Sequence, residues 1–153
     1  MLFEVMSQKQ RLDAVFARIS QVQGDDELRA HWAKYLCILT SGFIETSLRL
    51  ILSKYTSRKA APPILNFIDA QLERITNLNE QKIAQLLNSF SPDWSKAFLE
   101  KRTPQQKDSV DSVVANRHLI SHGRSVGITY VRVKQYYTDV VEVIRIIDEE
   151  CIA

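Results

Sequence analysis

The sequence predicts an all-α fold, in which long antiparallel helices form a bundle together with shorter helices. Residues that interrupt helices are scarce, since the 153 residues include four glycines and four prolines. Apolar residues recur at spacings of three and four over long stretches, and capping residues stand where these stretches begin. An apolar fraction of 45% and a charged fraction of 25% are typical of a globular protein. We expect one domain, residues 1–153.

The N-terminal third of the chain contains two long amphipathic stretches. The first predicts a helix over residues 3–23, closed by Gly24, with an apolar face at Leu12, Val15, Phe16, Ile19 and Val22. The second predicts a helix from Asp26 to Tyr55 with Asp25 as its N-cap. Gly42 lies inside this helix, where a glycine costs stability, so we expect a neighbouring helix to approach closely there.

Three short helices are predicted in the middle of the chain. A basic and then proline-rich linker, residues 57–63, precedes a helix over residues 64–75, and Pro63 suits its first turn. Asn79 is the expected cap of the next helix, residues 79–90. Ser91 followed by Pro92 indicates the start of the third, residues 91–102.

The clearest helix boundaries lie in the last third of the chain. Thr103 as N-cap, Pro104 at the first helical position and Gly123 as the stop delimit a helix over residues 103–123. A final helix begins near residue 129, and its apolar residues follow a heptad-type spacing: Val133, Tyr137, Val140, Ile144, Ile147 and Cys151. This face packs either inside the bundle or against a partner chain, and the sequence leaves both open.

Composition and charge limit the binding partners and the cellular compartment that we expect. A formal net charge of +2 produces no strong field that attracts nucleic acid, so any RNA binding has to be local. Two cysteines, Cys37 and Cys151, do not make a disulfide framework. Neither a secretory signal nor an apolar run of membrane-spanning length is evident. We therefore expect a soluble cytoplasmic protein with reduced thiols and no membrane association.

One short segment concentrates polar and charged side chains. Residues 115–125, ANRHLISHGRS, contain two of the three histidines, two arginines, an asparagine and two serines. His118 and His122 are four residues apart and share a helix face. Arg117 and His122 are five apart, so on a regular helix their directions differ by about 140° and their heights by about 7.5 Å. Gly123 ends the helix directly after His122, where the last turn can re-aim this histidine.

Three interpretations of this segment are open. The first is a metal site at His118 and His122, since this spacing suits zinc, although the neighbourhood offers no third ligand. The second is structural, because a histidine near a helix C-terminus stabilises the helix dipole and Arg124 adds to this. The third is RNA cleavage without a metal or other cofactor. There a histidine removes the proton of the ribose 2′-hydroxyl, and an arginine meets the charge that develops on the phosphate.

The segment resembles the motif of the HEPN superfamily, in which an arginine and a polar residue are followed by three residues and a histidine. Here the motif runs from Arg117 to His122. It stands near the end of a late helix that one more long helix follows, as in that superfamily. Residues 39–55, LTSGFIETSLRLILSKY, also resemble the long early helix of the RiboL-PSP-HEPN and MAE-type groups. The resemblance covers residues 25 to 150.

This resemblance implies a metal-independent endoribonuclease of toxin or antiviral-defence type, with RNA as substrate and an antitoxin protein as a further partner. It also implies a homodimer in which the arginine and histidine of both chains line one cleft. His122 would be the general base or acid at the 2′-hydroxyl, Arg117 would bind the scissile phosphate, and His118 would position the substrate or tune its neighbour. Further candidates for the site are Asn116, Ser121, Arg124 and, as an orienting residue, Glu45.

Two alternatives to a nuclease follow from the same sequence. A non-catalytic HEPN-like module that binds a nucleotide, RNA or a partner protein would keep the fold without the reaction. A helical dimerisation scaffold, built on the heptad-type face of the last helix, is the other. In that case Val140→Glu and Ile144→Glu should yield monomers, while Arg117→Ala should change nothing.

Overall fold

The computed structural model describes residues 1–152, which form seven helices and no strand, confirming the all-α fold class. Each segment expected to be helical forms a helix, and the side chains of three expected N-caps accept backbone hydrogen bonds: Asp25, Asn79 and Thr103. The helices are α1 (Phe3–Ser20), α2 (Asp26–Ser57), α3 (Pro62–Glu73), α4 (Glu80–Phe90), α5 (Pro92–Lys101), α6 (Pro104–Ser121) and α7 (Tyr130–Ile152).

The first helix ends three residues before the expected boundary. The N–H groups of Gln21 and Val22 donate to the carbonyls of Arg18 and Ile19, at 3.2 and 3.0 Å. These bonds span three residues, so the last turn tightens and the helix closes before Gly24 is reached.

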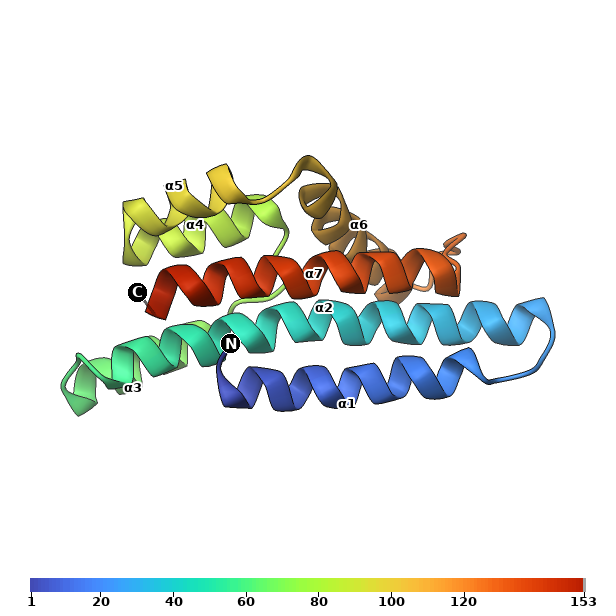
Figure 1. Cartoon of the computed structure of the whole chain (residues 1–153), viewed down its shortest axis with the longest axis horizontal. Coiled ribbons are helices and arrows are strands. Elements are labelled where there is room, and N and C mark those ends of the chain that lie inside the picture. Colours follow the sequence, from blue (N-terminus) through green and yellow to red (C-terminus); the bar gives the residue numbers. More distant parts are fainter. Residues whose placement is uncertain (153) are drawn as a thin grey trace.

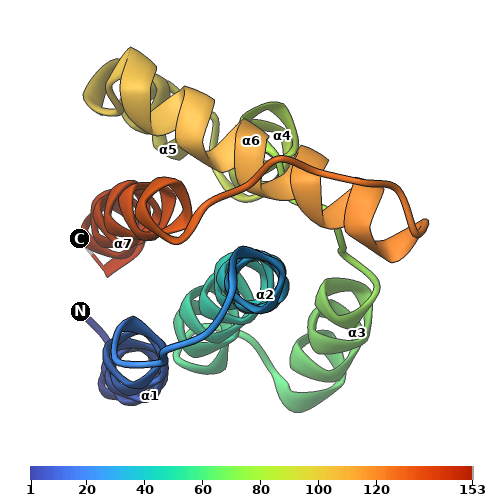
Figure 2. The same ribbon diagram turned by 90° about the vertical axis from the view of Figure 1, so that its right-hand side faces the viewer.

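The central helix is α2, which contacts α1, α3, α6 and α7. Figure 1 shows α1, α2 and α7 lying side by side, with α1 running antiparallel to α2 and α7 running in the same direction as α2. Figure 2 shows that α6 crosses these helices steeply, which carries its C-terminal end across the bundle toward α3. The short helices α4 and α5 pack together, and they contact α6 and α7 respectively.

The heptad-type face of α7 is buried within this chain. All six of its residues, from Val133 to Cys151, are buried, and Val140 and Ile144 are fully inaccessible. The helices that cover α7 include α2 and α6. The hypothesis of a dimerisation scaffold on this face is therefore wrong, because the face already has intramolecular partners.

By length and composition, α2 meets the criteria for a helix that crosses a membrane, which corrects the expectation that the sequence contains no such run. In this structure 61% of its most apolar window is buried among the other helices. Burial on several sides explains the composition, since a helix surrounded by neighbours is apolar around most of its circumference.

Both cysteines are free and buried. Burial raises the pKa of each thiol, Cys37 and Cys151, to about 12. Both thiols are therefore protonated at neutral pH, which makes them unreactive packing residues.

The α1 helix is attached to α7 by an aromatic and polar cluster. The Phe16 ring stacks on Tyr137 with centroids 4.6 Å apart, and the Tyr137 hydroxyl donates to Asp13 Oδ1 at 2.5 Å. Burial pushes the pKa of Asp13 upward, but hydrogen bonds from Lys9 and Tyr137 and the charges of Lys9 and Lys134 outweigh it and lower this pKa. The contact stabilises the ionised carboxylate in the folded protein.

Candidate functional site

The C-terminal end of α6 fixes the residues of the motif in space. Gly123 has φ of 68°, in the left-handed region that favours glycine. Its N–H donates to the Ile120 carbonyl at 3.0 Å, and the Arg124 N–H donates to the Leu119 carbonyl at 2.9 Å. This pair of bonds is the Schellman ending of a helix. The chain therefore turns sharply after His122, and Arg124 lies back against the last turn.

Two histidines and an arginine share one open cavity at this helix end. His118, Leu119, His122 and Arg124 line a space of about 320 Å³. The imidazole centroids of His118 and His122 lie 4.5 Å apart with the rings tilted by 60°. Both histidines and Arg124 are exposed. The cavity thus offers two groups that accept and donate protons beside a permanent cation, which suits acid–base chemistry on a phosphate.

Among residues 1–152, no third metal ligand lies next to the two histidines. Within residues 1–152, no three or more His, Cys, Asp or Glu side chains gather closely enough to hold a metal ion. His118 and His122 therefore have no third ligand of these types in the part of the chain that the structure describes.

Arg117 takes a different direction from the two histidines. It is not among the residues that line their cavity, in keeping with the helical offset between positions 117 and 122. Its guanidinium Nη1 donates to Asn77 Oδ1 at 2.7 Å, across 40 residues of sequence. Within one chain the structure thus brings together His118, His122 and Arg124, and it holds Arg117 against the loop between α3 and α4.

That loop is tied to α2 through Glu45. The Asn77 N–H donates to Glu45 Oε1 at 2.8 Å, while Glu45 Oε2 lies 3.4 Å from the Arg49 guanidinium. Glu45 is only 9% exposed, so it lies beneath the loop and not in the histidine cavity. Sequence reasoning did not identify Asn77. Asparagine tolerates the left-handed backbone, but nothing local reveals a partner on α6.

Two further candidates use their polar groups on their own helix. The Asn116 side chain donates to the Ser112 carbonyl at 2.8 Å, and the Ser121 hydroxyl donates to the Arg117 carbonyl at 2.9 Å. Neither residue lines the histidine cavity. In this conformation both satisfy backbone carbonyls near the end of α6.

A groove of about 460 Å³ with both apolar and basic lining residues opens beside the loop that holds Arg117. The residues that line it include Arg74, Thr76, Leu78 and Lys82. Thr76 and Leu78 flank Asn77 in the sequence, so the groove and the anchor of Arg117 belong to the same segment. Arg74 and Lys82 give this groove a local positive charge, although the net charge of the chain is only +2.

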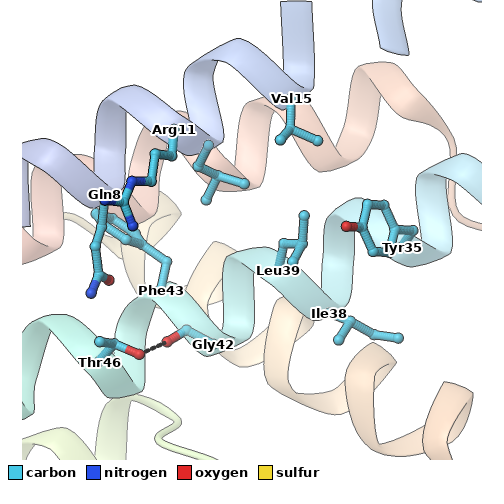
Figure 3. Close-up of a pocket in the computed structure, with 10 residues that line it drawn as sticks. Gln8, Arg11, Val15, Tyr35, Ile38, Leu39, Gly42, Phe43 and Thr46 are labelled. Atoms are coloured by element: carbon cyan, nitrogen blue, oxygen red, sulfur yellow. Dashed lines mark hydrogen bonds between the residues drawn. The ribbon is translucent and has the colours of Figure 1, made fainter. Parts of the chain in front are cut away.

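An apolar groove of about 470 Å³ lies between α1 and α2, away from the motif (Figure 3). Val15, Leu39 and Phe43 lie on its sides, and Gly42 lies on the α2 side. Among residues 1–152, a Cβ atom built on Gly42 would meet no heavy atom within 4 Å apart from its chain neighbours and the adjacent backbone of its own helix. The expectation that a neighbouring helix approaches Gly42 closely is therefore wrong for this chain, because the residue faces an open groove.

Comparisons with known proteins agree with this architecture. Searches of curated proteins and of solved structures found no match. A family comparison matches residues 7–153, nearly the whole chain, to RiboL-PSP-HEPN. Membership in this family points to a nuclease-like or RNA-related module. The all-helical chain, with its Arg117–His122 motif at the end of the penultimate helix, belongs to the RiboL-PSP-HEPN family of the HEPN superfamily.

Proposed function

We propose that the protein is a metal-independent endoribonuclease of toxin or antiviral-defence type that acts in the cytoplasm. The observation that carries this proposal is the cavity at the end of α6, where both histidines of the motif stand beside Arg124. RNA brings its own nucleophile, so a site with proton-transfer groups and a cation needs no further reactant.

Two imidazoles are suited to the two proton transfers of the reaction. His122 takes the proton of the 2′-hydroxyl, and the 2′-oxygen forms a bond to phosphorus while the bond to the 5′-oxygen breaks. The departing 5′-oxygen takes a proton from an imidazolium, a role that falls to His118. The products are a 2′,3′-cyclic phosphate and a free 5′-hydroxyl. A guanidinium balances the charge that develops on the phosphate oxygens.

The proposal includes a homodimer. Arg117 is assigned to the scissile phosphate, yet in one chain it points to Asn77 while His122 lines another cavity. A two-fold axis can bring diverging groups together with their symmetry mates, and in the proposed dimer Arg117 of one copy faces His122 of the other. Arg124, in the same cavity as the histidines, is then the cation supplied by the same chain.

An RNA cleavage assay in the absence of divalent metal tests the nuclease proposal. Purified protein is incubated with RNA in EDTA, and we expect fragments that end in a cyclic phosphate. His122→Ala should lower the rate by about 10²- to 10⁴-fold, as loss of a general acid or base does. His31→Ala is the matched control, because His31 is an exposed histidine on α2 outside this cavity. Equal rates for the wild type and His122→Ala would refute the proposal.

RNA binding is assigned in part to the groove beside the α3–α4 loop. For single strands each phosphate contact contributes about 0.7 to the slope of log affinity against log salt. Replacing Arg74 and Lys82 with alanine in the non-cleaving His122→Ala protein should therefore lower that slope by about 1.4. Alanine at Arg18 and Lys96, exposed cations on α1 and α5, is the control and should leave the slope unchanged.

The main alternative is a non-catalytic HEPN-like module that binds a nucleotide, RNA or a partner protein. RNA that is bound but left intact by the wild type would support it.

The proposed toxin role makes a separate prediction: expression arrests host growth, and His122→Ala relieves the arrest. It also implies an antitoxin protein that suppresses the activity of the wild type.

A further inference from the structure

We propose that Asn77 is a positioning residue for Arg117, and that Glu45 holds Asn77 in place. This inference rests on the proposed function, in which the Arg117 guanidinium binds the scissile phosphate. The three residues come from the α3–α4 loop, α6 and α2, and they are connected by two hydrogen bonds of 2.7 and 2.8 Å. The series ends at the Glu45 carboxylate, which is nine-tenths buried.

The chemical nature of the anchor supports this role. Asn77 binds Arg117 through a neutral amide oxygen, so the contact orients the guanidinium without cancelling its charge. Within residues 1–152, Arg117 forms no ion pair. Arg117 is also half-buried, where an unpaired charge is unfavourable. A phosphate oxygen would supply the missing negative charge.

Several contacts fix the backbone of Asn77. Asn77 has φ of 55°, and it is the only residue other than glycine with a positive φ among residues 1–152. Its N–H is bound by Glu45, and its carbonyl accepts from the Asn79 N–H at 2.9 Å. Leu78, the next residue, is only 2% exposed. The surroundings therefore hold Asn77 in a left-handed conformation that asparagine tolerates better than most residues do.

Preorganisation explains why this arrangement would help cleavage. A free arginine side chain samples many rotamers, and a guanidinium held before the substrate arrives loses less freedom when it binds the phosphate. One nitrogen of Arg117 is engaged by Asn77, and the guanidinium has further N–H groups for the substrate. Misplacement of such a group by about 1 Å costs up to about 100-fold in rate.

Two variants of Asn77 separate orientation from charge. Asn77→Gly keeps the positive φ and removes the acceptor, and we expect kcat/KM to fall by about 10- to 100-fold while Tm stays nearly unchanged. Asn77→Asp keeps the acceptor but adds a negative charge beside the guanidinium. It should therefore retain the fold and still bind RNA more weakly, because the carboxylate competes with the phosphate.

A double-mutant cycle with Arg117 tests whether Asn77 acts through the arginine. In the Arg117→Ala protein, Asn77→Gly should cause no further loss of kcat/KM. A purely structural role would make the two losses multiply. The same comparison is made for RNA affinity in the non-cleaving His122→Ala protein, which supplies a measurement that does not depend on turnover.

The outcomes separate the two proposals. If the wild type cleaves RNA and Asn77→Gly has the same kcat/KM, or if the losses multiply, the role of Asn77 is refuted and the nuclease remains. If the wild type neither binds nor cleaves RNA, both proposals fall. If it binds without cleaving and only the Asn77 and Arg117 variants weaken binding non-additively, Asn77 positions Arg117 for RNA binding and the nuclease proposal is refuted.

Discussion

Replacing Glu45 with alanine tests whether one buried carboxylate holds the α3–α4 loop. Glu45→Ala removes the acceptor of the Asn77 N–H, whose bond is 2.8 Å long and partly buried. A backbone donor left without a partner costs about 1–3 kcal/mol. Each buried methylene lost from the side chain adds about 0.8 kcal/mol. Glu45→Ala removes one methylene, so we expect the free energy of unfolding to fall by about 2–4 kcal/mol, which for a chain of this length lowers Tm by about 4–16 °C.

Glu45→Gln is the matched control, because its amide oxygen still accepts from Asn77. It removes the charge attraction to Arg49 and the hydrogen bond that the Arg49 guanidinium donates to the other carboxylate oxygen at 3.4 Å, and the Arg49 side chain is 35% exposed. Such a partly solvated pair contributes about 1 kcal/mol or less. The loss is measured by urea denaturation, together with hydrogen exchange of the Asn77 amide. Equal losses for Glu45→Gln and Glu45→Ala would refute the reasoning, since charge and not the hydrogen bond would then hold the loop.

Three further predictions concern stability and assembly. Gly42→Ala should raise the free energy of unfolding by about 0.5–1 kcal/mol, because no atom from a neighbouring element lies within 4 Å of the new Cβ and alanine favours a helix; a loss measured by thermal unfolding would contradict an open groove. Tyr137→Phe should cost about 1 kcal/mol at neutral pH. The folded-state pKa of Asp13 lies below its ordinary value of 3.8, so this contribution is present above that pH and is lost as the pH falls through the lowered pKa. Urea unfolding near neutrality and at about pH 3 should therefore show the deficit shrinking in acid, and an equal deficit at both would contradict it. Mixing Arg117→Ala with His122→Ala chains should restore about a quarter of wild-type cleavage if each site combines residues of two copies, whereas no recovery would show that the site does not form across a dimer.

The helices were predictable because their signals are local. Caps such as Asp25 and Thr103 act on N–H groups three residues away, and apolar periodicity repeats within a single turn. Gly123 marked the end of α6 for the same reason, since only a residue at ease with positive φ closes a helix in this way. Boundaries that depend on the last turn, such as the end of α1 at Ser20, were less well predicted.

The candidate site was predictable only where its members are neighbours in sequence. His118 and His122 share a helix face by spacing alone, and their rings are in contact distance in the folded chain. The bond from Arg117 to Asn77 spans 40 residues and the bond from Asn77 to Glu45 spans 32. No local pattern encodes contacts of this range, because they depend on how α2, α6 and the α3–α4 loop pack together.

Local signals in the sequence specified which segments are helical, where the capped helices begin, which residues form the apolar faces, and that two imidazoles lie together at the end of α6. The tertiary structure alone decided that the heptad-type face of α7 is covered by its own chain and that Gly42 faces open space. It also decided that Arg117 is held by a neutral side chain. Periodicity specifies that a face is to be buried, but the partner that buries it is set by the packing of all the helices at once.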